Sequence, residues 1–391
     1  NLKYNNTKIL ENSYGISLRN LALFAEKIYP NEEPMKAALK AISVMLFKLE
    51  GQVILRNPDY NMTDKLLLHK VNVEKQTVEI DGTEYAIKEE AFPTVNFDSG
   101  DMEDIYQLSE EEEQVMEGLR MAFVNSIRLR QHIDFLYQKG SMYRIFNGNL
   151  LYHGCVPLDE KGNFRKVKIG SKQYSGKELY DVLEYYARKG YYEQDNREEH
   201  EYGKDIMWYI WSNENSPVYG KEKMATFERY FIADKEVQIE RKDHYYRLIE
   251  REDVVNNILK EFGVDIEKGH IINGHMPVHV KEGESPVKCN GKVMIIDGGF
   301  SKAYRGTTGI AGYTLIYNSR GLRLVSHETF TSTEDVIEKE IDVHSDTVIR
   351  EVSAQRERVI DTETGRQLKE QISDLEKLLH AYRTGQILEK E

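Results

Sequence analysis

The sequence is poor in cysteine, in proline and in net positive charge. Its 391 residues include 2 Cys and 8 Pro, and the formal net charge is −13 at pH 7. Two cysteines do not imply a disulfide framework, so a reducing cytoplasm fits the chain. The acidic balance argues against nucleic acid or an anionic membrane surface as the main partner. No run of about eighteen apolar residues occurs, so no membrane span is predicted.

The apolar residues, 40% of the chain, are enough to build a packed core. Their spacing alternates between helical and strand-like periods, which predicts an α/β protein. A capping box at Ser109 and Glu112 marks the start of one long helix. The expected helices cover residues 14–29, 34–54, 110–138, 241–262 and 363–383. A larger region, residues 175–262, is also expected to be mostly helical. The expected strands and hairpins lie at residues 65–89, 142–154, 310–318 and 321–327.

One stretch, residues 269–299, contains most of the candidate chemistry. Two short apolar runs, Ile271–Ile272 and Val293–Ile296, each stop at an Asn or Asp that is followed by glycine. Runs bounded in this way are typical of buried strands. His275 comes just after the first run, at the carboxyl end of a strand, where open α/β sheets place their ligands. An imidazole there suits a zinc, manganese or iron ion, and a capped strand-end histidine is the alternative.

His153 repeats this pattern in an earlier part of the chain. An apolar run at residues 150–152 ends at His153 and is followed by Gly154. Two histidines at equivalent strand ends can meet at one edge of a sheet. The sequence therefore indicates His153 and His275 as a pair of metal ligands, with two unrelated core histidines as the alternative.

Four segments of the chain resemble the class III fructose-1,6-bisphosphatases of anaerobic and low-GC bacteria. They read LYHGCVP, NSPVYGKEKMATFERYF, NGHMPV and DGGFSKAYRGTTGIAGYTL, in the family's order, and the resemblance runs across nearly the whole chain. It implies a calcineurin-like metallophosphoesterase, an α/β fold with a two-sheet core and with helical and β-hairpin insertions. It also implies hydrolysis of the 1-phosphate of fructose 1,6-bisphosphate, a step of gluconeogenesis, at a site with two manganese ions.

The resemblance places His153 in the fourth metal motif of the superfamily and His275 in the fifth, as ligands of one metal ion. His279 is a weaker candidate, because Pro277 occupies the position where many members have a second histidine. Two divalent ions about 3.5–4 Å apart would hold the phosphoryl oxygens and lower the pKa of a bridging water. Four cations in the family-like segments are candidates for binding the sugar phosphates, with solvated surface cations as the alternative: Lys221, Lys223, Arg229 and Arg305.

Three earlier metal motifs of the superfamily are missing from the sequence. D-x-H matches at Asp342–His344, near the wrong end, and G-D-x-x-D matches at residues 100–104 without the expected arginine, so we interpret both as coincidences. We therefore expect the carboxyl-terminal part of the enzyme, with a core incomplete at its amino end and no catalytic residue of its own. Two histidines alone hold manganese poorly, because this ion prefers carboxylate oxygens. The chain should be inactive without an amino-terminal segment.

The resulting prediction is a cytoplasmic, manganese-dependent sugar bisphosphatase that binds neither nucleic acid nor membranes, with homo-oligomer formation left open. Two alternatives remain. One is another metallophosphoesterase, acting on proteins or nucleotides, and the other is a non-catalytic scaffold or regulatory relative. The expected segments are a helical part of the core (1–60), a β-hairpin excursion with an acidic loop (61–108), the core with a helical insertion at 175–262 (109–330), and a β/helix extension (331–391).

Overall fold

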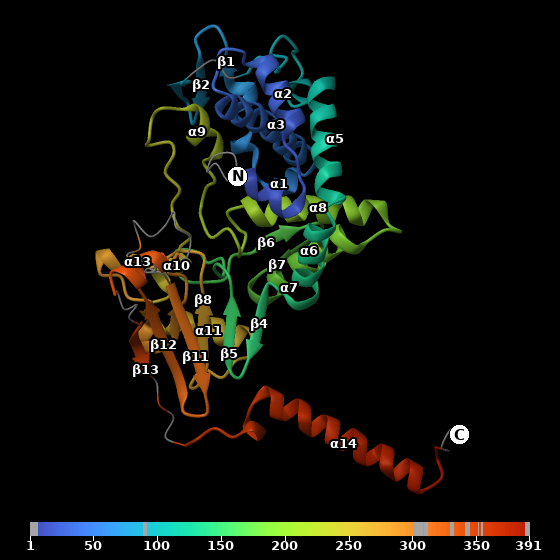
Figure 1. Ribbon diagram of the computed structural model, residues 1–391, viewed down its shortest axis with the longest axis vertical. Coiled ribbons are helices and arrows are strands. Elements are labelled where there is room, and N and C mark those ends of the chain that lie inside the picture. The colour runs from blue at the N-terminus through green and yellow to red at the C-terminus, as the bar shows by residue number, and fades with distance from the viewer. Residues whose placement is uncertain are drawn as a thin grey trace. The chain divides into compact units, whose positions relative to one another are not determined.

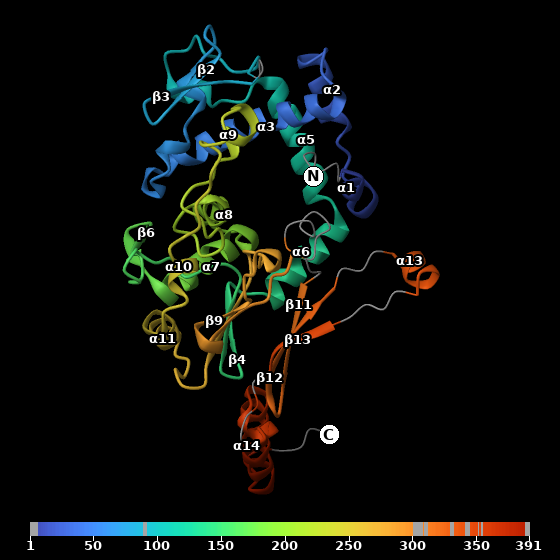
Figure 2. The ribbon, with the colours of Figure 1, turned by 90° about the vertical axis from the view of Figure 1, so that its left-hand side faces the viewer.

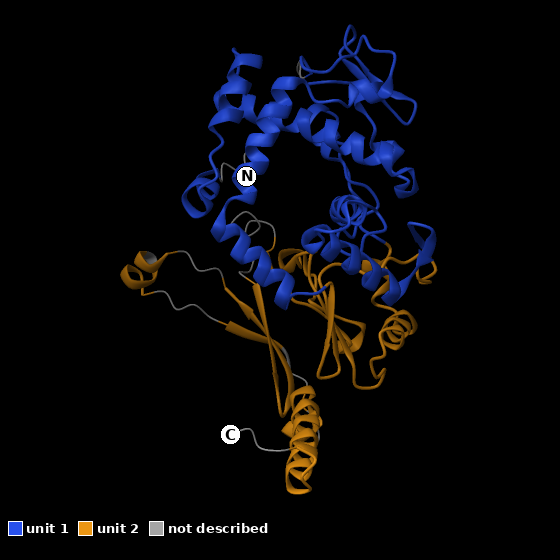
Figure 3. Ribbon diagram, turned by 90° about the vertical axis from the view of Figure 1, so that its right-hand side faces the viewer, with its two compact units in different colours: residues 1–141, 165–243 blue, residues 142–164, 244–391 orange. Residues whose placement is uncertain are grey.

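The computed structural model describes residues 7–88, 92–299, 308, 312–328, 332–340, 345–350, 352 and 355–387. The chain is an α/β protein that divides into two compact units (Figure 3). Unit 1 contains residues 1–141 and 165–243, and unit 2 contains residues 142–164 and 244–391. The division into four segments made from the sequence stays a prediction. No helix within the described ranges is both long enough and apolar enough to cross a membrane.

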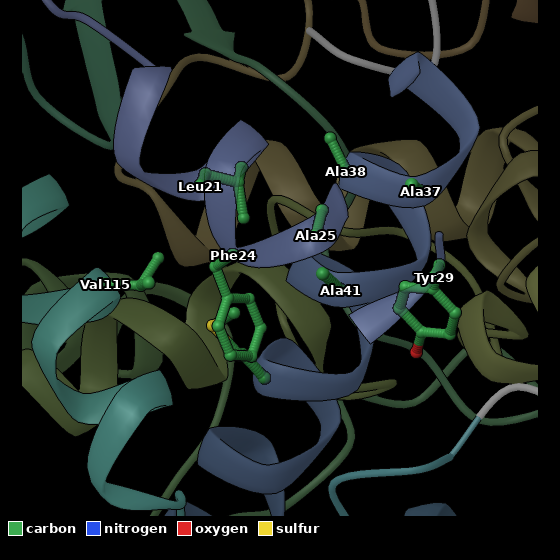
Figure 4. Close-up of a cluster of buried hydrophobic side chains, with 9 residues drawn as sticks. Leu21, Phe24, Ala25, Tyr29, Ala37, Ala38, Ala41 and Val115 are labelled. Atoms are coloured by element: carbon green, nitrogen blue, oxygen red, sulfur yellow. The ribbon is translucent and has the colours of Figure 1, made fainter. Parts of the chain in front are cut away.

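Unit 1 begins with three helices, α1 (Thr7–Tyr14), α2 (Arg19–Ile28) and α3 (Pro34–Arg56). Proline stands at the first position of α3, where its missing N–H costs nothing. Figure 4 shows the core that α2 and α3 build with α5 (Glu110–Val124). Small residues of α3 lie against larger side chains of α2, which allows close helix contact. The labelled members of this core are Leu21, Phe24, Ala25, Tyr29, Ala37, Ala38, Ala41 and Val115.

The single helix expected over residues 110–138 is wrong, because the structure has two helices there. After α4 (Met102–Ile105), helix α5 starts in the predicted capping box of Ser109 and Glu112, and α6 (Ile127–Lys139) follows it. The break lies at Asn125 and Ser126, two residue types that favour helix ends over helix interiors. The backbone of Ser126 is extended, and its hydroxyl donates to the carbonyl of Tyr14 at 2.7 Å. A contact from outside the helix therefore stabilises the interruption.

A small antiparallel sheet confirms the hairpin predicted around Asp81 and Gly82. It contains β1 (Val71–Asn72), β2 (Thr77–Ile80) and β3 (Thr83–Ala86) in that order. Asp81 and Gly82 both have positive φ, as a two-residue hairpin turn requires. The hairpin is shorter than expected, because a short 3₁₀ turn, Leu68–Lys70, occupies its first part, after two more such turns at Pro58–Tyr60 and Thr63–Lys65.

The rest of unit 1 contains a hairpin and three helices. The hairpin β6 (Val167–Ile169) and β7 (Lys172–Tyr174) leads into α7 (Gly176–Tyr192), α8 (Arg197–Ser212) and α9 (Thr226–Phe231). Helices α7 and α8 touch through two glycines. A Cβ atom on Gly203 would lie 2.3 Å from the backbone nitrogen of Gly190, so this crossing has no room for a side chain.

Unit 2 is organised around a five-stranded sheet in the order β4-β5-β8-β10-β9, of which Figure 1 labels β4, β5 and β8. Its strands are β4 (Tyr143–Phe146), β5 (Asn149–Tyr152), β8 (His270–Asn273), β9 (Val287–Lys288) and β10 (Val293–Ile295). The three central strands β5, β8 and β10 are parallel, and β4 and β9 pair with them antiparallel at the edges. All three residues of β10 are buried, as in strands with both faces covered.

The helix expected over residues 241–262 is also wrong as a single element. The structure has α10 (Tyr245–Leu248) and α11 (Glu252–Glu261), separated by an extended Arg251. The carboxylates of Glu252 and Asp253, in the first turn of α11, favour a helix start at this position, because they lie near the positive end of the helix dipole.

A second sheet of unit 2 confirms the strands predicted near residues 310–327. Figure 2 shows the long hairpin of β11 (Gly312–Asn318) and β12 (Gly321–His327), and β13 (Ser345–Arg350) pairs with β12. Between β12 and β13 lies α13 (Thr333–Glu338), and after a 3₁₀ turn, η7 (Val359–Asp361), the chain enters α14 (Glu363–Arg383). This last helix matches the predicted one at residues 363–383.

Candidate metal centre

Two histidines meet at the carboxyl edge of the five-stranded sheet. His153 directly follows β5 and His275 follows β8, and these neighbouring strands are parallel. Parallel neighbours end at the same edge of a sheet, so the topology brings the two side chains together. The Nε2 atom of His153 lies 3.0 Å from the Nδ1 atom of His275, and the ring centroids are 4.8 Å apart. The pairing predicted from the two strand ends is therefore present in the structure.

The two turns that carry these histidines are fastened to each other. The backbone N–H of Gly274 donates to the carbonyl of His153 at 2.9 Å. The side-chain amide of Asn273 donates to the carbonyl of Gly154 at 3.0 Å. His275 has a φ of 69°, a left-handed conformation that costs a residue with a side chain some free energy. These contacts hold the imidazoles in place although the backbone of one of them is strained.

Asn273 and Asp297 also belong to this centre, and neither was predicted from the sequence. Asn273 ends β8, and its carbonyl accepts from the N–H of Ile296 at 2.9 Å, which joins the end of β8 to the chain just after β10. Asp297 follows there and accepts from the N–H of Gly299 at 2.9 Å. The available signal was their position, because each is a polar residue directly before a glycine at the end of an apolar run.

Gly298, beside Asp297, is required by the second sheet. A Cβ atom at this position would lie 2.5 Å from the Cα atom of Gly312 at the start of β11. A real Cβ atom cannot come so close to backbone, so any side chain here would displace the turn that carries Asp297.

The surroundings keep His153 in the form that binds metals. Partial burial lowers the pKa of His153, because charging the ring becomes costly, and the carboxylate of Asp297 acts in the opposite direction. The net direction favours the neutral imidazole near neutral pH, and a neutral imidazole has a lone pair for a metal ion. Within the histidine contact itself, one ring nitrogen donates a hydrogen bond and the other accepts it.

The pair fits part of a divalent metal site. The separation of 3.0 Å between the ring nitrogens would allow both to contact one ion, because imidazole nitrogens bind metal ions at about 2.0–2.1 Å. The described residues do not complete the set. Nowhere in these ranges do three His, Cys, Asp or Glu side chains gather as a metal-binding group. The structure thus supports two imidazole ligands, which manganese binds less readily than carboxylates.

His279 is not brought into a three-residue group with this pair in the described part of the chain. It precedes a 3₁₀ turn, and its Nδ1 atom lies 3.6 Å from a carboxylate oxygen of Glu282. Its role as a ligand stays a prediction.

The two chance motif matches have different outcomes. Asp342–His344 lies outside the described residues, and Asp101 accepts from the N–H of Glu103 as the N-cap of α4.

Three of the four candidate phosphate-binding cations lie in unit 1, and each is paired with a carboxylate. Lys221 and Arg229 share one oxygen of the buried Glu240, at 2.7 Å and 3.1 Å. Lys223 lies 3.0 Å from the buried Glu228. Two cations on one carboxylate leave a net positive charge, so the Glu240 cluster can still attract an anion. Arg305 lies outside the described residues.

The fold and this site place the chain in a class of proteins. These are α/β proteins with a pair of histidines at the carboxyl edge of a mostly parallel sheet. The particular family follows from comparison with known sequences. The model of the Firmicute fructose-1,6-bisphosphatase family matches residues 1–384. The chain therefore belongs to this family, as its four sequence segments indicated.

Individual relatives agree with the family match. The class 3 fructose-1,6-bisphosphatase of Clostridium acetobutylicum is 48% identical, over 99% of this chain and 60% of the relative. The class 3 enzyme of Alkaliphilus metalliredigens is 47% identical, over 99% of this chain and 61% of its own length. That of Listeria innocua is 46% identical, over 99% of this chain and 62% of its own length. No solved structure matches the chain.

The chain spans about 60% of the length of the curated relatives that it matches. The same matches cover 99% of the chain itself. These matches do not confirm that the chain is a carboxyl-terminal fragment. That statement therefore stays a prediction.

Proposed function

We propose that this chain contributes to a metal-dependent phosphatase that hydrolyses the 1-phosphate of fructose 1,6-bisphosphate to fructose 6-phosphate. Membership of the Firmicute fructose-1,6-bisphosphatase family supports the reaction and the substrate. The observation that carries the proposal is the contact of 3.0 Å between His153 and His275 at a sheet edge where ligands bind. The calcineurin-like character of the core and the choice of manganese are parts of the same proposal.

His153 and His275 would hold the metal ion through the two ring nitrogens that face each other. A bound divalent ion supplies a polarised water and neutralises charge on phosphoryl oxygens. The chain's own contribution is to keep the imidazole of His153 neutral and both rings fixed, through the bonds of Asn273 and Gly274 to the opposite turn. Preorganised ligands lose little free energy on binding, which partly offsets a small ligand set.

The cations of the Glu240 cluster would hold a sugar phosphate. Lys221 offers a compact charge and Arg229 a planar pair of donors, and both are only partly covered, with side chains 26% and 41% exposed. Glu240 itself is 5% exposed and has its pKa lowered by hydrogen bonds from Lys221 and Ala225, although burial acts the other way. It therefore stays charged and keeps both cations in position for an incoming anion.

Phosphate release from fructose 1,6-bisphosphate with added manganese tests this function. It should be measured on this chain and on a longer form that carries the additional length of its relatives. We expect turnover by the longer form and little or none by this chain, because only two ligands come together among the residues that the structure describes. His153→Ala or His275→Ala should abolish the turnover of the longer form. Full turnover by this chain, or unchanged turnover by either variant, would contradict the proposal.

One observation favours a second candidate, a non-catalytic relative that keeps the shell of the fold. Within the residues that the structure describes, the ligand set stops at two imidazoles. A substrate panel separates the candidates. Release of phosphate from a nucleotide or a phosphopeptide in place of the sugar bisphosphate indicates another phosphoesterase, and no release from any substrate by the longer form indicates the non-catalytic relative.

The proposed location is the cytoplasm. The buried thiols of Cys155 and Cys289 support it, because buried thiols persist in a reducing compartment.

A further inference from the structure

Helix α14 exposes an apolar stripe along its length. Its one buried residue is Gly365, in the first turn. Six large apolar side chains of α14 are exposed, more than on any other helix in the described ranges, and Leu375 is 64% exposed. These residues are Leu368, Ile372, Leu375, Leu378, Leu379 and Tyr382. Single exposed apolar residues are common on protein surfaces, but a contiguous row of them marks an interaction surface.

Among the described residues, the contacts that hold α14 to the rest of unit 2 lie at the start of the helix. The N–H of Glu363 donates to the side chain of Asn147 in the β4–β5 turn at 2.9 Å. Gly365 lies against η7, where a Cβ atom would collide with the carbonyl of Val359. Beyond this first turn the helix extends away from the strands of its own unit in Figure 1. The apolar stripe begins where these contacts end.

The spacing of the stripe is that of a coiled coil. Leu368, Ile372, Leu375, Leu379 and Tyr382 follow one another at alternating steps of four and three residues. This is the a/d pattern of a heptad repeat, with Leu368, Leu375 and Tyr382 at d and Ile372 and Leu379 at a. A helix with this pattern buries its stripe against another helix that has the same pattern, so the sequence of α14 is complementary to itself.

The charged residues of α14 lie in two places, on the outer face of the helix and along the edge of the apolar stripe. On the outer face, Arg366 pairs with Glu363 and Glu370, and Lys377 pairs with Asp374. Lys369 and Glu376 occupy e positions beside the stripe, and neither takes part in an ion pair in the described structure. Charges at these positions select partner and orientation in coiled coils. They are therefore available to a second helix.

We propose that α14 binds α14 of a second copy of this chain as a two-stranded antiparallel coiled coil. In that orientation e positions face e positions, so Lys369 of each copy lies beside Glu376 of the other, and the symmetry makes two such pairs. Ile372 then packs against Leu375 across the axis. A parallel pair would place Lys369 beside Thr364 and Glu376 beside Gln371, neither of which is charged. The helix has acidic and basic side chains in equal number, which gives no attraction to an anionic lipid surface.

Sedimentation equilibrium on the full chain tests the pairing. We expect a reversible dimer, because about three heptads bind weakly. Leu375→Glu should weaken the dimer at least tenfold, since it places a charge in the centre of the stripe. The matched control Gln367→Glu, on the outer face of the same helix, should leave the dimer unchanged. A chain that remains monomeric at about 100 µM overturns the proposal.

A charge exchange tests the partner and the orientation. Lys369→Glu and Glu376→Lys should each weaken the dimer several-fold, because like charges would face each other. The double variant restores opposite charges in an antiparallel pair and should recover the original affinity. Failure of the double variant to recover it would overturn the antiparallel pairing, and so would binding to neutral or anionic phosphatidylcholine/phosphatidylserine vesicles in place of dimer formation. All of these positions are exposed, so the variants should fold normally.

Discussion

Two sets of buried polar groups, one in each unit, are satisfied to different degrees. In unit 1 the ion pair of Lys48 and Glu112 is 1% exposed on both sides, and every charged atom in it has hydrogen-bond partners from Thr94 and Ser109 or from the pair itself. In unit 2 the side-chain oxygens of Asn149 and Asn273 are buried without a hydrogen-bond donor in the described structure. A closed network stabilises a fold, whereas the open oxygen of Asn273, which lies next to two histidines, leaves capacity for a ligand.

The largest stability effect is expected at the closed network of unit 1. Lys48→Met removes one charge and leaves the carboxylate of Glu112 buried without its cation, which should destabilise unit 1 by about 3–5 kcal/mol. Both tryptophans, Trp208 and Trp211, lie in α8 of unit 1. Urea unfolding followed by tryptophan fluorescence therefore reports on this unit.

The adjacent carboxylate provides the control. Glu111 pairs with Lys27 at 2.5 Å, and their side chains are 50% and 63% exposed. Lys27→Met should cost less than about 1 kcal/mol, because water screens an exposed pair. Equal effects of the two variants would show that the Lys48 network adds nothing beyond a surface pair, and the contrast between the units would lose its basis.

A second buried carboxylate makes the stability of unit 1 depend on pH. Burial raises the pKa of Glu50 from 4.5 to about 7, and a hydrogen bond from Trp208 only partly opposes this. A raised pKa means that the folded unit binds the proton more tightly than the unfolded chain. The stabilisation is fully present below pH 4.5 and is lost as the pH rises to about 7. The total loss is about 3 kcal/mol.

Glu50→Gln should remove this dependence. Between pH 5 and pH 8 the free energy of unfolding of the variant should change less than that of the original chain, and the variant should be the more stable one at pH 8. The glutamine still accepts from Trp208, so packing is retained. Tryptophan-detected urea titrations at the two pH values measure the difference. A variant with the same pH slope as the original chain would place the titrating group elsewhere.

Much of the candidate site could be predicted because local signals and topology agree. Apolar runs that end at glycine located β5 and β8, and the position of His153 and His275 at their ends followed from the rule for parallel sheets. The charged terminal helix and the Asp81–Gly82 turn were also predicted, since helix and turn signals act over a few positions.

The errors arose where contacts from distant parts of the chain decide the outcome. The break at Asn125 and Ser126 depends on a bond to Tyr14, which lies 112 residues away in the sequence. The pairing of Lys221 and Arg229 with Glu240 could likewise not be predicted. The sequence alone does not show whether a lysine or arginine is paired with a buried carboxylate or exposed to solvent. The role of Asn273 depends on its hydrogen bond to Gly154. These two residues are close together because β5 and β8 are neighbours in the sheet.

The smallest expected effect concerns the two buried asparagines of unit 2. Asn149 begins β5, and its amide donates to the carbonyls of Phe146 and Asn147 at 3.2 Å and 3.0 Å, away from the histidines. Asn273 ends β8, and its amide donates to Gly154, beside His153. The two are 5% and 1% exposed, so they form a matched pair at opposite ends of neighbouring strands.

Asn149→Ala and Asn273→Ala should each destabilise unit 2 by about 1–2 kcal/mol, because each removes buried hydrogen bonds. Only Asn273→Ala should also weaken the binding of Co²⁺, by about tenfold, because groups that orient metal ligands have effects of that size. Hydrogen exchange of peptides from β5 and β8 measures stability, and calorimetric Co²⁺ titration measures affinity. If both variants lower the affinity equally, the histidine pair depends on the stability of the whole sheet and not on the bond from Asn273. If only Asn273→Ala lowers it, the amide holds the two histidine turns in register, and the open polar groups of unit 2 differ in purpose from the closed network of unit 1.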